Sequence, residues 1–211
     1  MKLIGMLDSP YVRRVAISLQ LLGLRFEHQS LSVFRGFDDF RRINPVVKAP
    51  TLLCDDGTVL MDSTLILEYA QALARPRSLM PGDLTRLQRS LHLTGLALAG
   101  CEKAVQIVYE RGLRPPEKRH QPWIDRVTGQ MLAAFSALED ELAAQPLAAT
   151  SSSIGQAGLT TAVVWTFTQA LLPELVPAAR YPALGAHSAQ CEALPEFRAA
   201  PHGEGTYRSG A

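Results

Sequence analysis

Ser9 stands where an apolar segment of the chain passes into a helical pattern. The chain opens MKLIGMLDSPYVRR, in which residues 2–7 read as a short buried strand. From Pro10 onward, apolar residues recur at spacings of three and four, which predicts a helix that ends at Gly23. A serine directly before a proline is typical of a helix N-cap. The same position also places a hydroxyl at the positive end of a helix, where an anion is stabilised. The residues alone leave both roles open.

A second polar pair, Asp62-Ser63, precedes the helical stretch TLILEYAQALA. Its simplest interpretation is again an N-cap. Upstream of it, the stretches KAPTLLC and TVLM flank Asp55-Asp56-Gly57, and Asp-Gly between apolar runs predicts a β-hairpin. Ala49-Pro50 then reads as a turn before the first hairpin strand. These assignments bring three polar turns into one small α/β unit.

The order of predicted elements divides the chain. Strand, helix, strand, short helix, hairpin and helix fill residues 1–76, and residues 77–84 form a linker rich in Pro and Gly. No strand pattern returns within 85–200, which we expect to form an all-helical domain. Its predicted helices span 84–113, 123–144, 157–172 and 181–194. Trp123 and Trp165 are expected in its core. Residues 201–211, PHGEGTYRSGA, show no periodicity and are expected to be a mobile tail.

Composition excludes several classes of function. The 211 residues are 47% hydrophobic and carry a net charge of +1, so no electrostatic argument favours nucleic acid or an anionic membrane. No stretch has the length of a membrane span, and the first residues lack a secretory signal pattern. Cys54, Cys101 and Cys191 form no CxxC pair and read as buried free thiols, which favours a cytoplasmic location. The five histidines show no metal-ligand spacing.

Four segments carry a resemblance to a known family. SPYVRRVAISL, NPVVKAPTL, DSTLILEYA and YPALGAHSAQCEALPEFRA occur in the order and at the spacing found in bacterial cytosolic glutathione transferases of the serine type, and the resemblance extends to about Phe197. It implies an α/β thioredoxin-like N-terminal domain that binds glutathione and an all-α C-terminal domain. It further implies a homodimer, glutathione as cosubstrate, and no metal.

The resemblance assigns roles to the polar turns. The Ser9 hydroxyl would donate to the sulfur of glutathione and stabilise its thiolate, the nucleophilic form. Pro50 would be a cis proline, so that the Ala49 backbone pairs with the cysteinyl backbone of glutathione. Asp62 would take the γ-glutamyl ammonium, while Ser63 and the helix start take its carboxylate.

The remaining parts of the ligand are assigned less directly. Lys48 and Arg35 are the candidate cations for the glycine carboxylate of glutathione. Tyr11 and Tyr109 are the candidates for a pocket that holds the electrophile. One departure concerns the helix near GQAGLTTAVVW, where relatives often carry Thr and, three residues later, Asp. Here those positions hold Gly155 and Gly158, so the reciprocal capping bonds cannot form, which predicts a loss of about 1 kcal/mol in stability.

Three functions remain open at this stage. The first is a glutathione transferase, in which the thiolate attacks a small hydrophobic electrophile. The second is a glutathione-dependent disulfide reductase or peroxidase; the absence of a cysteine at position 9 argues against a mixed disulfide with the protein, but two glutathiones can still do the redox work. The third is a non-catalytic protein-binding module on the same fold, which the presence of Ser9 and Asp62-Ser63 disfavours.

Overall fold

The computed structural model describes residues 1–208 and divides the chain into two compact units. Met1–Leu79 and the segment from Glu192 onward form the first unit, and Met80–Cys191 form the second. The α/β and all-helical parts expected from the sequence are therefore both present. The last segment differs from the expectation, because it belongs to the α/β unit and not to the helical one.

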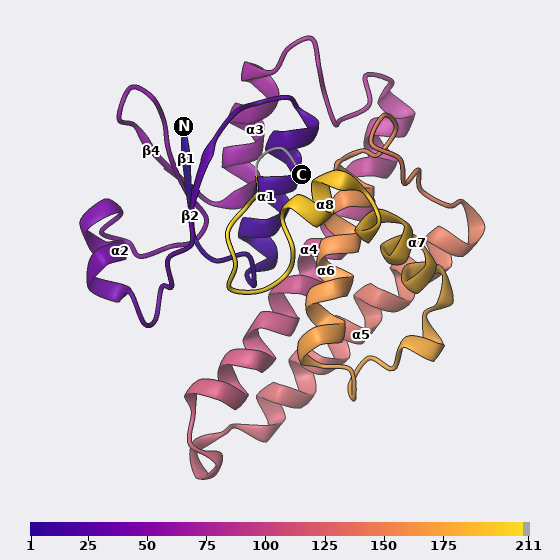
Figure 1. The fold of residues 1–211 in the computed structure, drawn as a ribbon. Helices are drawn as coiled ribbons and strands as arrows, with labels where there is room; N and C mark the ends of the chain where they lie inside the picture. The colour runs from indigo at the N-terminus through magenta and orange to yellow at the C-terminus, as the bar shows by residue number, and fades with distance from the viewer. Residues whose placement is uncertain (209–211) are drawn as a thin grey trace. The chain divides into compact units, whose positions relative to one another are not determined.

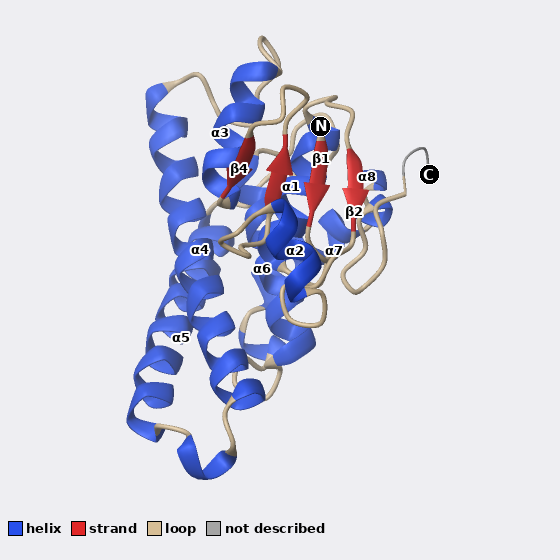
Figure 2. Cartoon of the chain, turned by 90° about the vertical axis from the view of Figure 1, so that its left-hand side faces the viewer, coloured by secondary structure: helices blue, strands red, loops and turns tan. Residues whose placement is uncertain are grey.

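A four-stranded sheet organises the first unit. Its strands are β1 (Lys2–Ile4), β2 (Glu27–Gln29), β3 (Thr51–Leu53) and β4 (Val59–Met61), in the order β2-β1-β3-β4. β1 and β2 are parallel, as expected for strands joined through a helix, and the other pairs are antiparallel. Figure 2 shows the strands side by side, with β4 and β2 at the edges. The helices are α1 (Pro10–Leu21), α2 (Phe37–Ile43), α3 (Ser63–Leu73) and α8 (Pro195–Ala199).

Helix α1 is buried on nearly all sides, although its sequence predicts a single apolar face. Arg13 and Arg14 are only 1% and 2% exposed. The Arg13 guanidinium donates to both carboxylate oxygens of Glu192 at 2.6 Å and to the Ala200 carbonyl at 2.8 Å, and it lies over the Phe197 ring. Because this arginine is paired and hydrogen-bonded, its burial is tolerated. The C-terminal segment consequently runs beside α1 (Figure 1).

Residues 201–208 lie against the first unit, which differs from the mobile tail expected from the sequence. The Tyr207 ring stacks on Phe26 with centroids 4.5 Å apart, and the Tyr207 N–H donates to His28 Nδ1 at 3.0 Å. Glu204 pairs with Arg35 at 2.6 Å. Aromatic stacking and an ion pair attach this segment to the first unit. Analysis of hydrophobic periodicity does not detect contacts of these kinds. The expected tail extends to residue 211, and residues 209–211 lie outside the described part.

The second unit contains only helices within its described residues. They are α4 (Leu84–Leu113), the 3-10 turn η1 (Pro116–Lys118), α5 (Gln121–Ala144), α6 (Gln156–Leu171), the 3-10 turn η2 (Ala178–Arg180) and α7 (Pro182–Glu192). α4 and α5 form a long antiparallel pair (Figure 2). Phe135, Trp165 and Tyr181 pack edge to face in the core. Trp165 is buried as predicted, whereas the prediction for Trp123 is wrong, since 41% of it is exposed.

No helix of residues 1–208 is long and apolar enough to cross a membrane.

Candidate functional site

Sheet register brings the three polar turns to one end of the first unit. Ile4, the last residue of β1, pairs with Thr51, the first residue of β3, and Thr51 pairs with Met61, the last residue of β4. The turn after β1, the segment before β3 and the start of α3 therefore lie at the same edge. Antiparallel pairing of β3 with both neighbours produces this convergence.

Gly5 allows the first two turns to approach closely. Its φ is +135°, and a Cβ there would lie 2.6 Å from Val12 Cγ2 and 3.1 Å from Ala49 Cβ. Any side chain would push apart the start of α1 and the segment that carries Ala49. Glycine at this position thus places the Ala49 backbone next to the turn that bears Ser9.

Ser9 is the N-cap of α1, with an extended backbone and Pro10 at the first helical position. Its Oγ accepts the Val12 N–H at 3.4 Å, and the side chain is only partly buried. A hydroxyl has one proton and two lone pairs, so a capping Ser9 still has its proton to donate. The two roles that the sequence left open are therefore compatible in one side chain.

A carboxyl lies directly before this hydroxyl. Desolvation raises the pKa of Asp8, and the Ser9 backbone N–H opposes that shift by lowering it. The turn before α1 therefore carries an acidic side chain directly beside the Ser9 hydroxyl.

The Ala49–Pro50 peptide bond is cis, as the resemblance implies. A polar chain holds the segment before it: the Asn44 side-chain amide donates to Thr51 Oγ1 at 2.8 Å, and Thr51 donates to the Lys48 carbonyl at 2.7 Å. Asn44 is 1% exposed, so these hydrogen bonds are shielded from water. Among residues 1–208 the backbone N–H and C=O of Ala49 make no hydrogen bond, which leaves both for a ligand.

Asp62 has an unusual backbone at the start of α3. Its φ is +73° and its ψ is 124°, a region that residues other than glycine rarely occupy. Its side chain accepts the Thr64 N–H at 2.9 Å, so it is the N-cap, and the next residue, Ser63, is 4% exposed. A disfavoured backbone conformation costs on the order of 1–3 kcal/mol, and such conformations gather at binding sites.

Arg14 is a site residue that sequence reasoning missed. Its Nη1 donates to Ser63 Oγ at 3.1 Å and to Thr64 Oγ1 at 3.3 Å. Since the Ser63 oxygen already accepts a bond, its own proton is directed toward another acceptor. A permanent cation also lies beneath the positive end of α3, where it favours a carboxylate. A signal existed in VRRV, which places two charges within an apolar helical pattern.

The two cations proposed for a terminal carboxylate differ in their partners. Arg35 already forms its ion pair with Glu204. Lys48 is exposed and forms no ion pair within residues 1–208. Lys48 also lies next to Ala49, at the end of the sheet where the polar turns meet. The geometry therefore favours Lys48.

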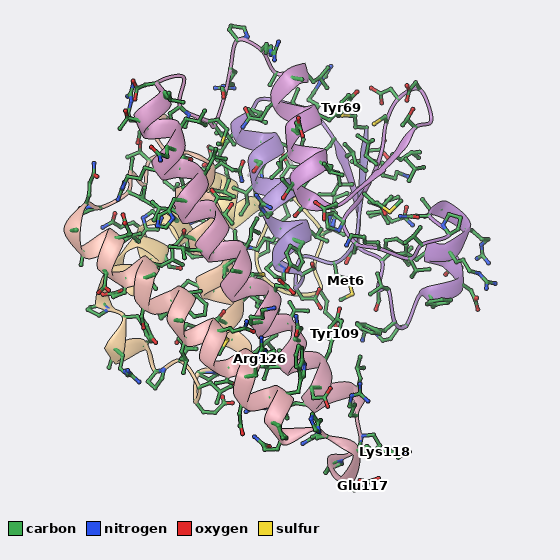
Figure 3. All side chains as sticks on the ribbon, turned by 180° about the vertical axis from the view of Figure 1, so that it is seen from behind. Met6, Tyr69, Tyr109, Glu117, Lys118 and Arg126 are labelled. Atoms are coloured by element: carbon green, nitrogen blue, oxygen red, sulfur yellow. The ribbon has the colours of Figure 1, made fainter. Side chains whose placement is uncertain are left out.

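Tyr11 and Tyr109 belong to separate units, and each is described by itself. Tyr11 is partly buried on α1 of the first unit. Tyr109 is 44% exposed on α4, before the turn that carries Glu117 and Lys118 (Figure 3). A shared role for them stays a prediction. The three cysteines are free and buried, as expected, and burial raises the pKa of Cys54.

Comparison with known proteins matches these features to one family. Residues 3–78 match the family model described as glutathione S-transferase, N-terminal domain. The uncharacterized GST-like protein YibF of Escherichia coli is 26% identical over 142 residues, which are 67% of this chain and 70% of that protein. The maleylacetoacetate isomerase of Pseudomonas aeruginosa is 29% identical over 148 residues, which are 65% of this chain and 69% of the isomerase.

A solved structure extends the similarity over nearly the whole chain. A glutathione S-transferase of Methylobacterium radiotolerans, in complex with glutathione sulfonate, is 26% identical and has a TM-score of 0.84. The match covers 93% of this chain and 92% of that one. Together, these comparisons support the glutathione transferase family for this chain, and its two units have the thioredoxin-like and all-helical architecture of that family.

Proposed function

We propose that the protein is a glutathione transferase that holds the glutathione sulfur as a thiolate for attack on a small hydrophobic electrophile. The observation that carries the proposal is the Ser9 hydroxyl at the start of α1, which caps the helix and keeps a proton to donate. In this mechanism Ser9 attacks nothing, and the nucleophile is the sulfur of glutathione. Neither a base nor a metal is needed to activate Ser9.

The energies of a hydrogen bond and of a helix N-terminus are large enough for Ser9 and α1 to stabilise a thiolate. A free thiol with a pKa near 8.5 is about 3% ionised at neutral pH. A hydrogen bond to a charged acceptor contributes about 1.5–3 kcal/mol, and a helix N-terminus about 0.3–1 kcal/mol. Together they lower a thiol pKa by roughly 1.5–3 units, which makes the thiolate the majority species at neutral pH.

The remaining turns supply the binding of glutathione in this proposal. The γ-glutamyl ammonium binds Asp62, and its carboxylate takes the Ser63 proton beside the Arg14 cation. The cysteinyl backbone pairs with the N–H and C=O of Ala49, next to Pro50. The glycine carboxylate binds Lys48. These interactions orient the sulfur toward Ser9, while Tyr11 and Tyr109 are proposed to contact the electrophile.

Ultraviolet titration of bound glutathione tests this function directly. In the complex, thiolate absorbance is expected to appear at a pH roughly 1.5–3 units lower than for glutathione in buffer. Retention on immobilised glutathione and turnover of a chloronitrobenzene-type acceptor should accompany it. A thiol that ionises in the complex as it does in buffer would contradict the proposal, even if glutathione binds.

A second candidate is a glutathione-dependent isomerase, which the similarity to maleylacetoacetate isomerase favours. The thiolate would add to a conjugated double bond, rotation would follow, and loss of the thiolate would restore the double bond. This route uses the same Ser9 hydroxyl and releases no leaving group. Turnover of maleylacetoacetate without consumption of glutathione would support it over conjugation.

We also propose a cytoplasmic homodimer. One face of α3 presents Leu65, Tyr69 and Leu73, which are 59%, 39% and 50% exposed and follow each other at four-residue spacing. Figure 3 labels Tyr69 on this helix. An apolar stripe of this kind suits a subunit interface. Light scattering should give twice the chain mass, and Leu65→Glu should shift the protein toward the monomer.

A further inference from the structure

A cavity of about 340 Å³ lies wholly within the helical unit. The start of α4, the segment that follows α5 and the start of α6 enclose it. It shares no residue with the glutathione site proposed above, and nothing in that proposal uses it. The residues that matter for its chemistry are Arg86, Arg89, Ser90, Ala157 and Gly158.

The start of α6 presents open backbone donors to this cavity. Gly155 is the N-cap and has no side chain to accept a bond from the first turn. The amides of Ala157 and Gly158, both lining the cavity, make no hydrogen bond within residues 1–208. α6 spans 16 residues, so its dipole is fully developed and its start carries a partial positive charge.

Ser90 provides an independent indication of a ligand. It lines the cavity, is only 8% exposed, and its hydroxyl makes no hydrogen bond to the described residues. This hydroxyl is open to the cavity, so it can donate its proton to a group that binds there.

Two arginines set the charge of the cavity. Arg89 is three-quarters buried; it donates to the Gln145 carbonyl at 2.7 Å and lies 3.6 Å from Glu141, which fixes its position. Arg86 is 78% exposed and lies 3.7 Å from Asp83. Neither Asp83 nor Glu141 lines the cavity, and its lining includes the Arg86 and Arg89 guanidinium groups and the Ser90 hydroxyl. Donors of these kinds converge on oxyanions in proteins.

We propose that this cavity binds a small molecule with an oxyanion head group, a phosphate or a carboxylate. The head group accepts from the Ala157 and Gly158 amides, the Ser90 hydroxyl and Arg86. Leu93, Pro146 and Leu147 form apolar walls, which suit a short apolar body attached to the head group.

Titration calorimetry on the full chain, with ionic strength held constant by sodium chloride, tests this site. The probes are inorganic phosphate, phenyl phosphate and benzoate. Saturable binding of phenyl phosphate or benzoate, tighter than that of inorganic phosphate, is expected. If inorganic phosphate binds as tightly as phenyl phosphate, the ligand is the free ion and the apolar walls play no part. No saturable heat with any probe would overturn the proposal.

Variants locate the binding. Ser90→Ala and Arg86→Gln should each weaken it by about three- to tenfold through loss of a donor. Arg126→Gln is the matched control, because Arg126 is exposed on α5, nineteen residues before Gln145 (Figure 3). Gly155→Ser should abolish binding, since its hydroxyl takes the open amides. Equal weakening in Arg86→Gln and Arg126→Gln, or full binding in both Ser90→Ala and Gly155→Ser, would overturn the proposed site.

Discussion

The first turn of a helix has backbone N–H groups without partners inside the helix, and α3 and α6 differ in whether a side chain caps these groups. At the start of α3, Asp62 caps the helix with its side chain, and Arg14 donates to Ser63. At the start of α6, Gly155 offers no side chain, and the Ala157 and Gly158 amides make no hydrogen bond within residues 1–208. The first start presents an acid, a hydroxyl and a buried cation in fixed positions. The second presents little more than the partial charge of the helix.

Backbone geometry shows the same contrast. Asp62 adopts a φ of +73°, which costs on the order of 1–3 kcal/mol, whereas Gly155 has an unstrained φ of −104°. The α6 start instead lacks a side-chain capping bond, a loss of a few tenths of a kcal/mol relative to a serine cap. At the start of α3, side chains therefore select a ligand by its chemical groups, and the backbone of Asp62 is strained. Uncapped amides, as at the start of α6, favour any negatively charged group.

Removing the Ser9 hydroxyl leaves the start of α1 without a side-chain cap, like the start of α6. We expect this change to have the largest effect on activity. Ser9→Ala should lower the rate of conjugation about 10- to 100-fold, because a hydrogen bond to a charged sulfur is lost. Glutathione affinity, set by the other turns, should hardly change. Steady-state kinetics with a chloronitrobenzene-type acceptor measures the rate, and calorimetry measures the affinity.

Ser9→Thr is the control for this change, since it keeps the hydroxyl. It should retain most of the rate while sharing any effect of altering the cap. If Ser9→Ala conjugates as fast as the unaltered protein, the hydroxyl takes no part in the mechanism, and bare amides suffice at both kinds of helix start.

The role of Arg14 predicts the next largest effect. Arg14→Met should weaken glutathione binding about tenfold, because Ser63 loses the donor that orients its proton. Arg14→Lys should rescue only part of the loss, since an ammonium keeps the charge but sits on a shorter side chain than the Arg14 Nη1 that donates to both Ser63 and Thr64. Calorimetry gives the affinities, and thermal unfolding confirms that each variant is folded.

A double-mutant cycle shows whether Arg14 positions the Ser63 hydroxyl or only contributes to packing of the fold. If Arg14 acts through Ser63, Arg14→Met should weaken binding much less in a Ser63→Ala background than in the unaltered protein. Additive effects would mean that the two residues act independently and that Arg14 only supports the fold.

Supplying the missing cap at α6 should give a smaller, stabilising effect. Gly155→Ser adds an acceptor and should raise the free energy of unfolding by a few tenths of a kcal/mol, or roughly 1 °C in melting temperature, because glycine is itself a tolerated N-cap. Gly155→Ala is the control, because it removes the same glycine without adding an acceptor. Calorimetric melting compares the two, and equal melting temperatures would exclude a capping effect.

Substitution of Gly158 should raise the melting temperature less than substitution of Gly155. A Cβ on Gly158 would lie 3.3 Å from His187 Cε1 and 3.4 Å from the Ala148 carbonyl oxygen, tighter than ordinary contact. The Thr-x-x-Asp pair, Gly155→Thr with Gly158→Asp, should still melt above the unaltered protein. Gly158→Asp alone should gain little, because its carboxylate would approach that carbonyl.

These residues also show what the sequence could and could not predict. Periodicity and turn chemistry predicted α4 at its observed bounds and the three polar turns, because those signals are local. Arg14, which lies 49 residues from Ser63, gave no local signal of its partner. The attachment of residues 201–208 depends on contacts between residues far apart in the chain, such as Arg35 with Glu204, 169 residues apart, and His28 with Tyr207, 179 residues apart. The roles assigned to individual site residues remain proposals.

Acidification should give the smallest effect and probe the starts of α1 and α6 together, because a histidine contacts the backbone at or just before each of them. His28 Nε2 lies 2.7 Å from the Gly5 carbonyl, in the turn that leads to α1, and His187 Nε2 lies 3.0 Å from the Gly158 carbonyl in the first turn of α6. Burial lowers the pKa of both. Each folded-state pKa thus lies below the unfolded value near 6.5, and the unfolded chain binds more protons in between. Stability should therefore be complete above about pH 7 and fall as the pH drops below about 6.5.

His28→Gln and His187→Gln measure the share of this loss at each of the two starts, while His202, whose pKa burial also lowers, contributes equally in both variants. Urea unfolding at about pH 7.5 and about pH 5.5 gives the change in free energy for each variant, which should be about 1 kcal/mol or less per histidine. His187 is 6% exposed and His28 only partly buried, so His187→Gln should remove more of the pH dependence. His28→Gln could instead remove more of the pH dependence. That result would mean that loss of the hydrogen bond from the Tyr207 N–H to His28 Nδ1, which protonation of Nδ1 breaks, matters more than the difference in burial. The α1 start, with its attached C-terminal segment, would then be the more acid-sensitive of the two.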